Sequence, residues 1–259
     1  MTSPNAGSEF GGSVALVTGA AGIGIGQAIA RRLASGGAVV VVTDIHELRT
    51  KEVTEAIAAD YPDTEIYGCP LDAGDRGHID DVVDTVIDRF GAIDILVNNA
   101  AVNFVAPIFE FDPSEWDRVM DVNINGPWYL ARRIFPLMRE RSGGVVVNIG
   151  SYAPDVGGAG IETAYAVSKG GLSALTRCLA HEGGPHGIRA NTVSMGVVED
   201  TKFVMDHPEL LERKDALGPL GSLPHKDEIA EAIAFLASSR AAHITGEIIN
   251  VSGGAYMRN

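Results

Sequence analysis

The chain has 259 residues, of which 46% are hydrophobic and 21% charged, the balance of a globular protein that buries a large core. It carries 20 Lys and Arg against 34 Asp and Glu, and the formal net charge of −14 makes binding to nucleic acid or anionic lipid unfavourable. Because no apolar run reaches the ~18 residues of a membrane span and the first residues do not resemble a signal peptide, we expect a cytoplasmic protein with neither membrane nor nucleic-acid partners.

Short β-branched runs alternate with longer segments of helical period from Ser13 onward. Residues 1–12 are polar and Gly-rich, show no periodicity and predict a flexible leader. The predicted strands are Val14–Thr18, Ala38–Thr43, Glu65–Pro70, Ile93–Asn98, Val145–Ile149, Arg189–Val193 and Glu247–Val251. The predicted helices span about 24–36, 46–60, 76–90, 113–141, 163–183 and 227–239.

Most of these strands are apolar at successive positions, as in Val39–Val42, which is typical of strands buried on both faces of a parallel sheet. Each predicted helix is long enough to connect two parallel strands by a right-handed crossover. We therefore predict one α/β domain over residues 13–259, a doubly wound parallel seven-stranded sheet with helices on both faces. The irregular segment at about 195–225 is predicted to form a lid over the carboxyl edge of the sheet, where ligands bind in such folds.

The first predicted strand runs into a glycine-rich turn, and an Ala-rich helix follows at once. The nine residues Thr18–Gly26 include four glycines. Glycines in this context let the backbone approach a pyrophosphate, whose charge is met by free N–H groups at the helix start. The turn therefore predicts a dinucleotide-binding site that includes Gly19, Gly24, Ile25 and Gly26.

The second predicted strand leads into Asp44, 18 residues beyond Gly26. A carboxylate there can accept hydrogen bonds from both hydroxyls of the adenosine ribose, and it would repel a 2′-phosphate. Since we find no Arg or Lys in the turn or beside Asp44, the pattern favours NAD as the cofactor over NADP. Asp44 also fits the N-cap of the next helix, which is compatible with that role.

Tyr165 and Lys169 lie four residues apart at the start of an apolar helix and therefore share one face. A lysine ammonium near a phenol stabilises phenolate, and an oxidised nicotinamide would add further positive charge. We therefore expect the two together to lower the Tyr165 pKa from ~10 and make Tyr165 an acid/base group. Such a pair alone is common on helix surfaces. Ser151, however, follows the buried strand Val145–Ile149, where its hydroxyl can hold a substrate oxygen beside the phenol.

The order of these motifs resembles that of the short-chain dehydrogenase/reductase family in its classical single-domain form, over residues 13 to 254. The shared motifs are the turn 18–26, Asp44, Leu71–Ala73, Asn98–Ala101, Asn123, Asn148–Ser151, Tyr165 with Lys169, Gly187–Asn191 and Val251–Gly254. The resemblance implies a Rossmann-like fold with strand order 3-2-1-4-5-6-7. It also implies a homotetramer assembled through the helices at about 113–141 and 163–183.

The resemblance further implies the roles of single residues. Ser151 orients the substrate oxygen, Tyr165 exchanges the proton, and Lys169 also holds the nicotinamide ribose. Asn123 keeps a water in the proton relay behind Lys169, and Asp72 binds the adenine amino group. The implied cofactor-binding set is Gly19, Gly24, Ile25, Gly26, Asp44, Ile45, Asp72, Ala73, Asn99, Ala100, Ala101, Tyr165, Lys169, Gly196, Val198 and Thr201.

The sequence departs from the family pattern around the cofactor and the lid, but not at a catalytic group. One residue is inserted between Gly19 and Gly24, which leaves the pyrophosphate contacts of the turn open. Ala101 replaces a glycine, Met195 replaces a proline and Ser252 replaces an aspartate.

We predict an NAD-dependent oxidoreductase that interconverts a secondary alcohol and its ketone by hydride transfer to or from nicotinamide C4, with Tyr165 moving the proton. Two alternatives remain open, a biosynthetic ketoreductase of the β-ketoacyl type and a catalytically silent dinucleotide sensor. Enoyl reductases, which usually space the Tyr and Lys more widely, and sugar epimerases, which need a larger C-terminal substrate domain, fit less well.

No metal site is predicted, because the histidines and the two cysteines lack the spacing of metal ligands. We expect Cys69 and Cys178 to be small buried hydrophobes. The substrate cannot be read from the sequence, but an expected pocket lining that mixes apolar groups with Asn103, Glu162 and Glu199 favours an uncharged or cationic small molecule.

Overall fold

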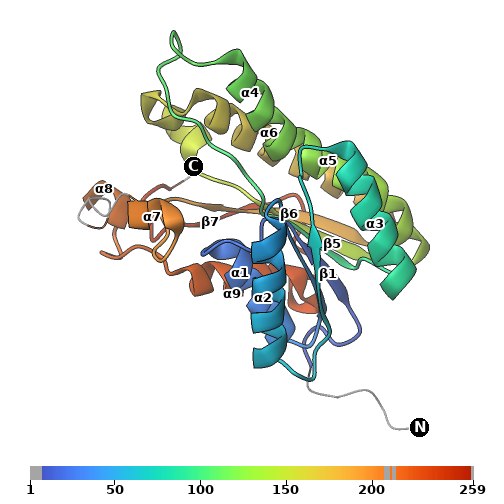
Figure 1. Ribbon diagram of the computed structural model, residues 1–259. Coiled ribbons are helices and arrows are strands. Elements are labelled where there is room, and N and C mark those ends of the chain that lie inside the picture. The colour runs from blue at the N-terminus through green and yellow to red at the C-terminus, as the bar shows by residue number, and fades with distance from the viewer. Residues whose placement is uncertain (1–7, 207–210, 212–213, 258–259) are drawn as a thin grey trace, which may run out of the picture.

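The computed structural model describes residues 8–206, 211 and 214–257. Over this part of the chain, seven parallel strands form one sheet in the order β3-β2-β1-β4-β5-β6-β7 (Figure 1). The strands are β1 (Val14–Val17), β2 (Val39–Asp44), β3 (Ile66–Pro70), β4 (Ile95–Asn98), β5 (Gly144–Ile149), β6 (Ile188–Met195) and β7 (Ile248–Val251). The predicted fold class and strand order are confirmed.

Helices cover both faces of the sheet (Figure 1). The main ones are α1 (Ile25–Ser35), α2 (Glu47–Asp60), α3 (Arg76–Phe90), α4 (Pro113–Met120), α5 (Gly126–Glu140), α6 (Thr163–Gly183) and α9 (Lys226–Ala237). Side chains alternate between the faces along each strand, so Val17 joins the core beneath α1 and α9, whereas Leu16 joins the core beneath α3 and α5. This explains why the strands read as nearly continuous apolar runs.

The helix predicted over 113–141 is not one regular helix, because a π-helical turn at Asp121–Asn125 separates α4 from α5. Pro127 has no N–H to donate to the carbonyl of residue 123, so the regular bonding pattern cannot pass through this point. The backbone also packs tightly, since a Cβ on Gly126 would lie 2.1 Å from the Ala73 carbonyl oxygen. Such π turns occur often at functional sites, and this one holds Asn123 fully buried.

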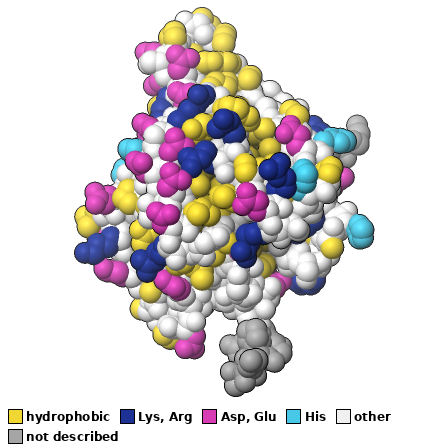
Figure 2. Space-filling view, turned by 90° about the vertical axis from the view of Figure 1, so that its right-hand side faces the viewer, with side chains coloured by type: hydrophobic (Ala, Val, Ile, Leu, Met, Phe, Trp, Pro, Cys, Tyr) yellow, Lys and Arg dark blue, Asp and Glu magenta, His cyan; other side chains and the backbone are white. Residues whose placement is uncertain are grey.

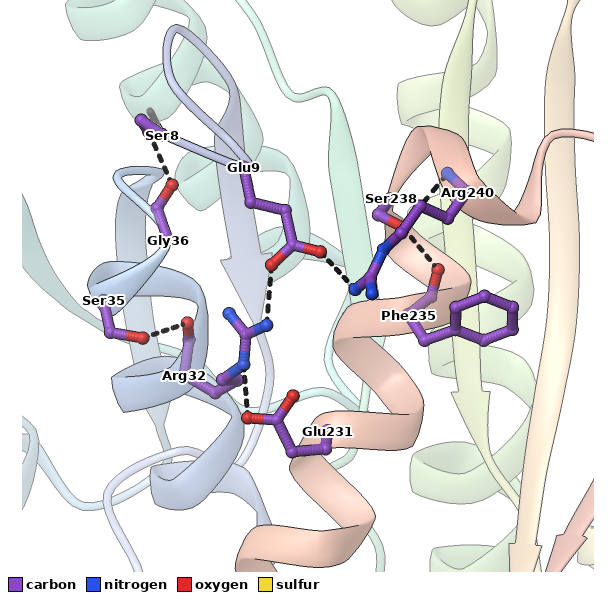
Figure 3. Close-up of polar contacts among 9 residues, drawn as sticks. All are labelled: Ser8, Glu9, Arg32, Ser35, Gly36, Glu231, Phe235, Ser238 and Arg240. Carbon is purple, nitrogen blue, oxygen red and sulfur yellow. Dashed lines mark hydrogen bonds and ion pairs between the residues drawn. The ribbon is translucent and has the colours of Figure 1, made fainter. Parts of the chain in front are cut away.

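The predicted flexible leader is wrong for residues 8–12, which pack against α1 and α9; residues 1–7 lie outside the described part of the chain. Phe10 is 3% exposed and its N–H donates a 2.8 Å hydrogen bond to the Gly36 carbonyl. Glu9 accepts hydrogen bonds from Arg32 and Arg240 (Figure 3). Full burial of a phenylalanine is worth ~1.5–3 kcal/mol, so this segment belongs to the folded body.

The face that carries α3 and α5 mixes acidic, basic and hydrophobic side chains (Figure 2). Arg133 pairs with Asp80 and with Asp84, and the Arg76 guanidinium lies 5.6 Å from the Trp128 ring centre. The negative charge of the chain therefore does not form a continuous acidic field on this face.

The exposure of the two cysteines and the apolar length of the helices complete the description of the fold. Cys178 is exposed on α6 and Cys69 is half-buried, so the expectation that both are buried is wrong. Among the described residues, no helix is both long and apolar enough to cross a membrane.

Candidate active site

The predicted acid/base pair lies where α6 begins beside the carboxyl end of β5. The Tyr165 hydroxyl faces Ser151, whose Oγ accepts a 3.0 Å hydrogen bond from the Ala153 N–H. Lys169 Nζ donates a 2.7 Å hydrogen bond to the Ile149 carbonyl and lies 5.5 Å from the centre of the Tyr165 ring. The fold thus brings Ser151, Tyr165 and Lys169 together at one edge of the sheet.

Burial controls the protonation of this pair. Burial, with the charge of Glu162 acting in the same direction, raises the pKa of Tyr165 to about 12 despite the hydrogen bond to Ser151. Burial also lowers the pKa of Lys169 to about 8. In the protein alone, desolvation disfavours the phenolate, so the lowering of the Tyr165 pKa that we expect from Lys169 together with an oxidised nicotinamide stays a prediction. Tyr165 is a neutral phenol at neutral pH.

Asn123 links the loop after β4 to helix α6 through hydrogen bonds. Its Oδ1 accepts a 2.9 Å hydrogen bond from the Val102 N–H, and its Nδ2 donates to the Val102 carbonyl and to Ser168 Oγ, each at 3.0 Å. Ser168 in turn donates to the Tyr165 carbonyl at 2.7 Å. Because these contacts engage the Asn123 side chain, its role in a water relay stays a prediction.

A chain of buried polar side chains ties the carboxyl ends of three strands to α6. Asn98 donates to Asn148 at 2.8 Å, and Asn148 donates to Thr176 Oγ1 at 2.8 Å. Thr176 Oγ1 is 2.7 Å from Thr192 Oγ1 on β6. Sequence reasoning missed Thr176 and Thr192, whose only signal is a polar residue within an apolar element.

The glycine-rich turn has a closed side and an open side. Gly19 has a φ of +63°, and a Cβ on Gly26 would lie 2.4 Å from the Gly19 carbonyl oxygen, so side chains are excluded there. Nothing lies within 4 Å of where a Cβ on Gly22 or Gly24 would be. The open side of the turn therefore lies at Gly22 and Gly24.

The start of α1 suits an anion. Its N-cap Gly24 offers no side-chain acceptor, and its first turn, which begins at Ile25, contains no acidic residue. The first N–H groups of a helix have no partner within the helix, so an anionic group facing the open turn would meet free donors. The residues of the turn thus fit the pyrophosphate of a dinucleotide.

Asp44 ends β2 at the same edge, and its side chain is 11% exposed. Its carboxylate accepts hydrogen bonds from the N–H groups of Ala21, at 3.3 Å, and His46, at 3.2 Å. Arg49, one turn into α2, lies 3.8 Å from the same carboxylate, so the expectation of no basic residue beside Asp44 is wrong. Burial raises the pKa of Asp44, and the charge of Arg49 opposes this rise.

Asp72, predicted at the adenine, is paired with a residue that sequence reasoning missed. It accepts 2.9 Å hydrogen bonds from Arg118 of α4 and from the Gly74 N–H. Burial alone would raise the pKa of Asp72, but the hydrogen bonds from Arg118 and Gly74 and the charge of Arg118 together outweigh burial, and the pKa is lowered. Asp72 is therefore a carboxylate at neutral pH.

Asn99 and Ala100 join β4 to the glycine-rich turn. Their N–H groups both donate to Thr18 Oγ1 at 3.0 Å, and Asn99 Nδ2 donates to the Gly19 carbonyl at 2.9 Å. A ribose beside them would therefore meet atoms other than these N–H groups. Of the remaining predicted contacts, Ala73 is buried, whereas Ile45 and Ala101 are exposed.

The predicted lid starts directly after β6. A Cβ on Gly196 would lie 2.1 Å from the Tyr152 ring, so only glycine fits there. Val198 is buried, and its carbonyl accepts a 2.8 Å hydrogen bond from Thr201 Oγ1. The segment continues as α7 (Lys202–Asp206) and α8 (Lys214–Leu217); the lid residues 207–210 and 212–213 lie outside the described residues.

The C-terminal segment also reaches this edge, which sequence reasoning did not foresee. The ring of Tyr256 stacks on Tyr152 with the ring centres 6.0 Å apart. Ser252 Oγ donates a 3.3 Å hydrogen bond to the Tyr256 carbonyl. The serine that replaces an aspartate of the family pattern thus holds the chain end beside the predicted substrate pocket.

Comparisons with known proteins agree with this geometry. A family model described as enoyl-(acyl carrier protein) reductase matches residues 19–256. The 3-oxoacyl-(acyl-carrier-protein) reductase FabG of Vibrio cholerae is 36% identical over 246 residues, covering 95% of this chain and 98% of the relative. A hexahydro-indene-carboxyl-CoA reductase of Mycobacterium tuberculosis is 37% identical over 249 residues, covering 93% and 92%. A solved structure described as a short chain dehydrogenase/reductase family protein has a TM-score of 0.85 at 33% identity, covering 96% of this chain and 99% of that one.

Proposed function

The chain belongs to the short-chain dehydrogenase/reductase family of oxidoreductases, and on that premise we propose that it interconverts a secondary alcohol and its ketone. The observation that carries this proposal is the Tyr165 phenol facing Ser151, with the buried Lys169 beside it. Ser151 holds the substrate oxygen within reach of the phenol, and Tyr165 transfers the proton. Acid/base catalysis of this kind typically contributes ~10²–10⁴-fold.

Nicotinamide dinucleotide supplies the hydride when it is bound. Gly24, Ile25 and Gly26 would face its pyrophosphate, and Asp44 its adenosine ribose. We propose NAD over NADP, because the Asp44 carboxylate is oriented by two N–H groups and would repel a 2′-phosphate. Arg49 weakens this repulsion, so we expect a preference rather than exclusion of NADP.

The cofactor preference is tested by comparing kcat/KM for NADH and NADPH. NADH should give the higher value, and Asp44→Ala should shrink the difference by admitting the 2′-phosphate. Arg49→Gln is the matched control and should enlarge it. Equal kcat/KM values for the two cofactors in the wild-type protein would contradict the proposal.

Two observations favour ketone reduction at neutral pH. A phenol whose pKa is raised to about 12 is in the protonated form that a general acid needs. The relatives are also named as reductases of 3-oxoacyl and carboxyl-CoA compounds. A ketoreductase acting on a 3-oxoacyl thioester is therefore the second candidate.

The deciding experiment is a turnover screen that follows NADH oxidation with ketones, 3-oxoacyl esters and 3-oxoacyl thioesters. Turnover only with thioesters would favour the second candidate over a general ketone reductase. A catalytically silent sensor predicts dinucleotide binding without turnover of any carbonyl compound. The enoyl reductase in the description of the family model is not our proposal, since Tyr165 and Lys169 are four residues apart and enoyl reductases usually space them more widely.

We propose that the protein is cytoplasmic and forms a homotetramer. Its partner is a small-molecule alcohol or ketone, the substrate. Trp128 on α5 is 41% exposed and Val167 on α6 is 50% exposed, which supports burial of these helices between copies. Light scattering coupled to size exclusion tests this, and a monomer at micromolar concentration would contradict it.

A further inference from the structure

A carboxylate stands beside the catalytic phenol that the proposed reaction does not need. Glu162 directly precedes α6 and lies three residues before Tyr165, so the two side chains lie about one helical turn apart. Glu162 is only partly exposed, and its charge reaches the phenol strongly enough to disfavour phenolate.

The carboxylate is held at the mouth of the site. Glu162 Oε1 accepts a 2.6 Å hydrogen bond from Asn103 Nδ2, which belongs to the loop after β4. The backbone joins the same two loops, since the Ala106 N–H donates a 3.0 Å hydrogen bond to the Ile161 carbonyl. Glu162 is therefore fixed between the two loops that border the substrate position.

The charge of Glu162 is not neutralised by its fixing partner, because an amide carries none. Lys169, which lies beside the Tyr165 ring, directs its Nζ to the Ile149 carbonyl. The groups that face the phenol are thus Ser151, the ammonium of Lys169 and the carboxylate of Glu162. A second negative charge on a substrate bound at the phenol would be repelled by the charge of Glu162.

We infer that Glu162 is a specificity-determining residue, which selects carbonyl substrates that are uncharged next to the reacting carbon and rejects their anionic counterparts. The inference rests on the proposed function and names the substrate class of the same site. Rejection by an unfavourable contact is a common route to specificity. Esters, thioesters and simple ketones satisfy this requirement, whereas free 3-oxo acids do not.

The test compares methyl acetoacetate, which is neutral, with acetoacetate, its anionic acid. The wild-type protein should favour the ester in kcat/KM by about tenfold to hundredfold. Glu162→Gln keeps the acceptor for Asn103 but removes the charge, and should shrink this ratio by at least about tenfold. Asn103→Ala is the matched control, because it removes the hydrogen bond and keeps the charge, and its ratio should stay within about threefold of wild type.

The inference would be overturned if Glu162→Gln left the ester-to-acid ratio of kcat/KM unchanged. It would also be overturned if Glu162→Gln and Asn103→Ala lowered this ratio equally, because that result would indicate a purely structural link between the loops. If neither compound is turned over, the two compounds are compared by ligand-observed NMR binding; only the lack of turnover of every carbonyl compound in the screen would refute the proposed function. Equal binding of ester and acid to the wild-type protein would overturn the inference on its own.

A spectroscopic measurement distinguishes failure of the inference about Glu162 from failure of the proposed function. In protein labelled with 3-fluorotyrosine, the fluorine resonance missing from Tyr165→Phe identifies Tyr165, and its pH titration needs no turnover. Glu162→Gln should lower the midpoint by about 0.5–1 unit, because a like charge beside the phenolate is removed. An unchanged midpoint would mean that the carboxylate does not reach the phenol, and would also overturn the inference.

Discussion

The two edges of the sheet hold charged groups under different conditions. At the amino edge, Glu9 pairs with Arg32 and Arg240, and Arg32 pairs with Glu231 (Figure 3). Burial alone would raise the pKa of Glu9, but its two arginine partners outweigh burial and the pKa is lowered. At the carboxyl edge, burial dominates instead and moves the pKa of Tyr165 to about 12 and that of Lys169 to about 8.

The difference shows what turns a polar cluster into a candidate active site. Paired charges keep their charged forms and stabilise the fold, whereas desolvated groups with few partners change their protonation and become available for proton transfer. Arg32 is an example of the first kind, since the hydrogen bonds that it donates to Glu9 and Glu231 raise its pKa against the effect of burial. Substitutions at the carboxyl edge should therefore change activity, and those at the amino edge should change stability.

The largest effect is expected for Tyr165→Phe. The change removes only the hydroxyl, so the ring still packs and dinucleotide binding should be nearly unchanged, while turnover should fall at least ~10²-fold. Steady-state kinetics and a dinucleotide titration measure the two properties. Wild-type turnover of any substrate by this variant would refute the proposed role of Tyr165.

Lys169→Met should slow turnover and weaken dinucleotide binding together. In the wild-type protein the ammonium is present below its pKa of about 8 and is lost as the pH rises through that value. The reduction rate should therefore be flat at neutral pH and fall above about pH 8. The variant, which has no ammonium to lose, should lack this decline. A decline with the same midpoint in Lys169→Met would assign it to another group.

Phe10→Ala tests the amino edge without touching a charge. The side chain is 3% exposed and contacts Gly36 closely, and truncation of a buried phenylalanine costs about 3 kcal/mol or more. Urea unfolding should show this loss, while kcat/KM at a temperature where the variant is folded should stay within about twofold of wild type. A stability loss under about 1 kcal/mol would mean that residues 8–12 are only loosely attached.

Glu9→Gln should have the smallest effect, about 0.5–1 kcal/mol of unfolding free energy at neutral pH, since the ion pairs are partly exposed and screened by salt. Because the folded pKa of Glu9 is lowered, this stability is present above the ordinary glutamate pKa of 4.5 and is lost as the pH falls below it. The difference between variant and wild type should therefore shrink in acid and in high salt. A difference that is independent of pH would contradict the electrostatic origin.

The strands and most helices could be predicted because their signals are local. The run Val39–Val42 and the helix Arg76–Phe90 carry their hydrophobic pattern within a few residues, and the observed ends differ from the predicted ones by two residues or fewer. The π turn at Asp121–Asn125 was not predicted, since it depends on Pro127 together with the packing of Gly126 against Ala73. Residues 8–12 were misread because a single buried Phe10 gives no periodic signal.

For the candidate site, the sequence by itself determined which groups can do chemistry. The four-residue spacing of Tyr165 and Lys169, the position of Ser151 after a strand and the glycines of Thr18–Gly26 are properties of the chain alone. Only the tertiary structure decided the state of those groups. The charge of Glu162 on the phenol, the approach of Arg49 to Asp44 and the burial of Lys169 depend on distances across loops and helices. A pKa depends on the solvent and charges around a group, and these depend on how the folded chain packs, even where the neighbouring charge is close in sequence.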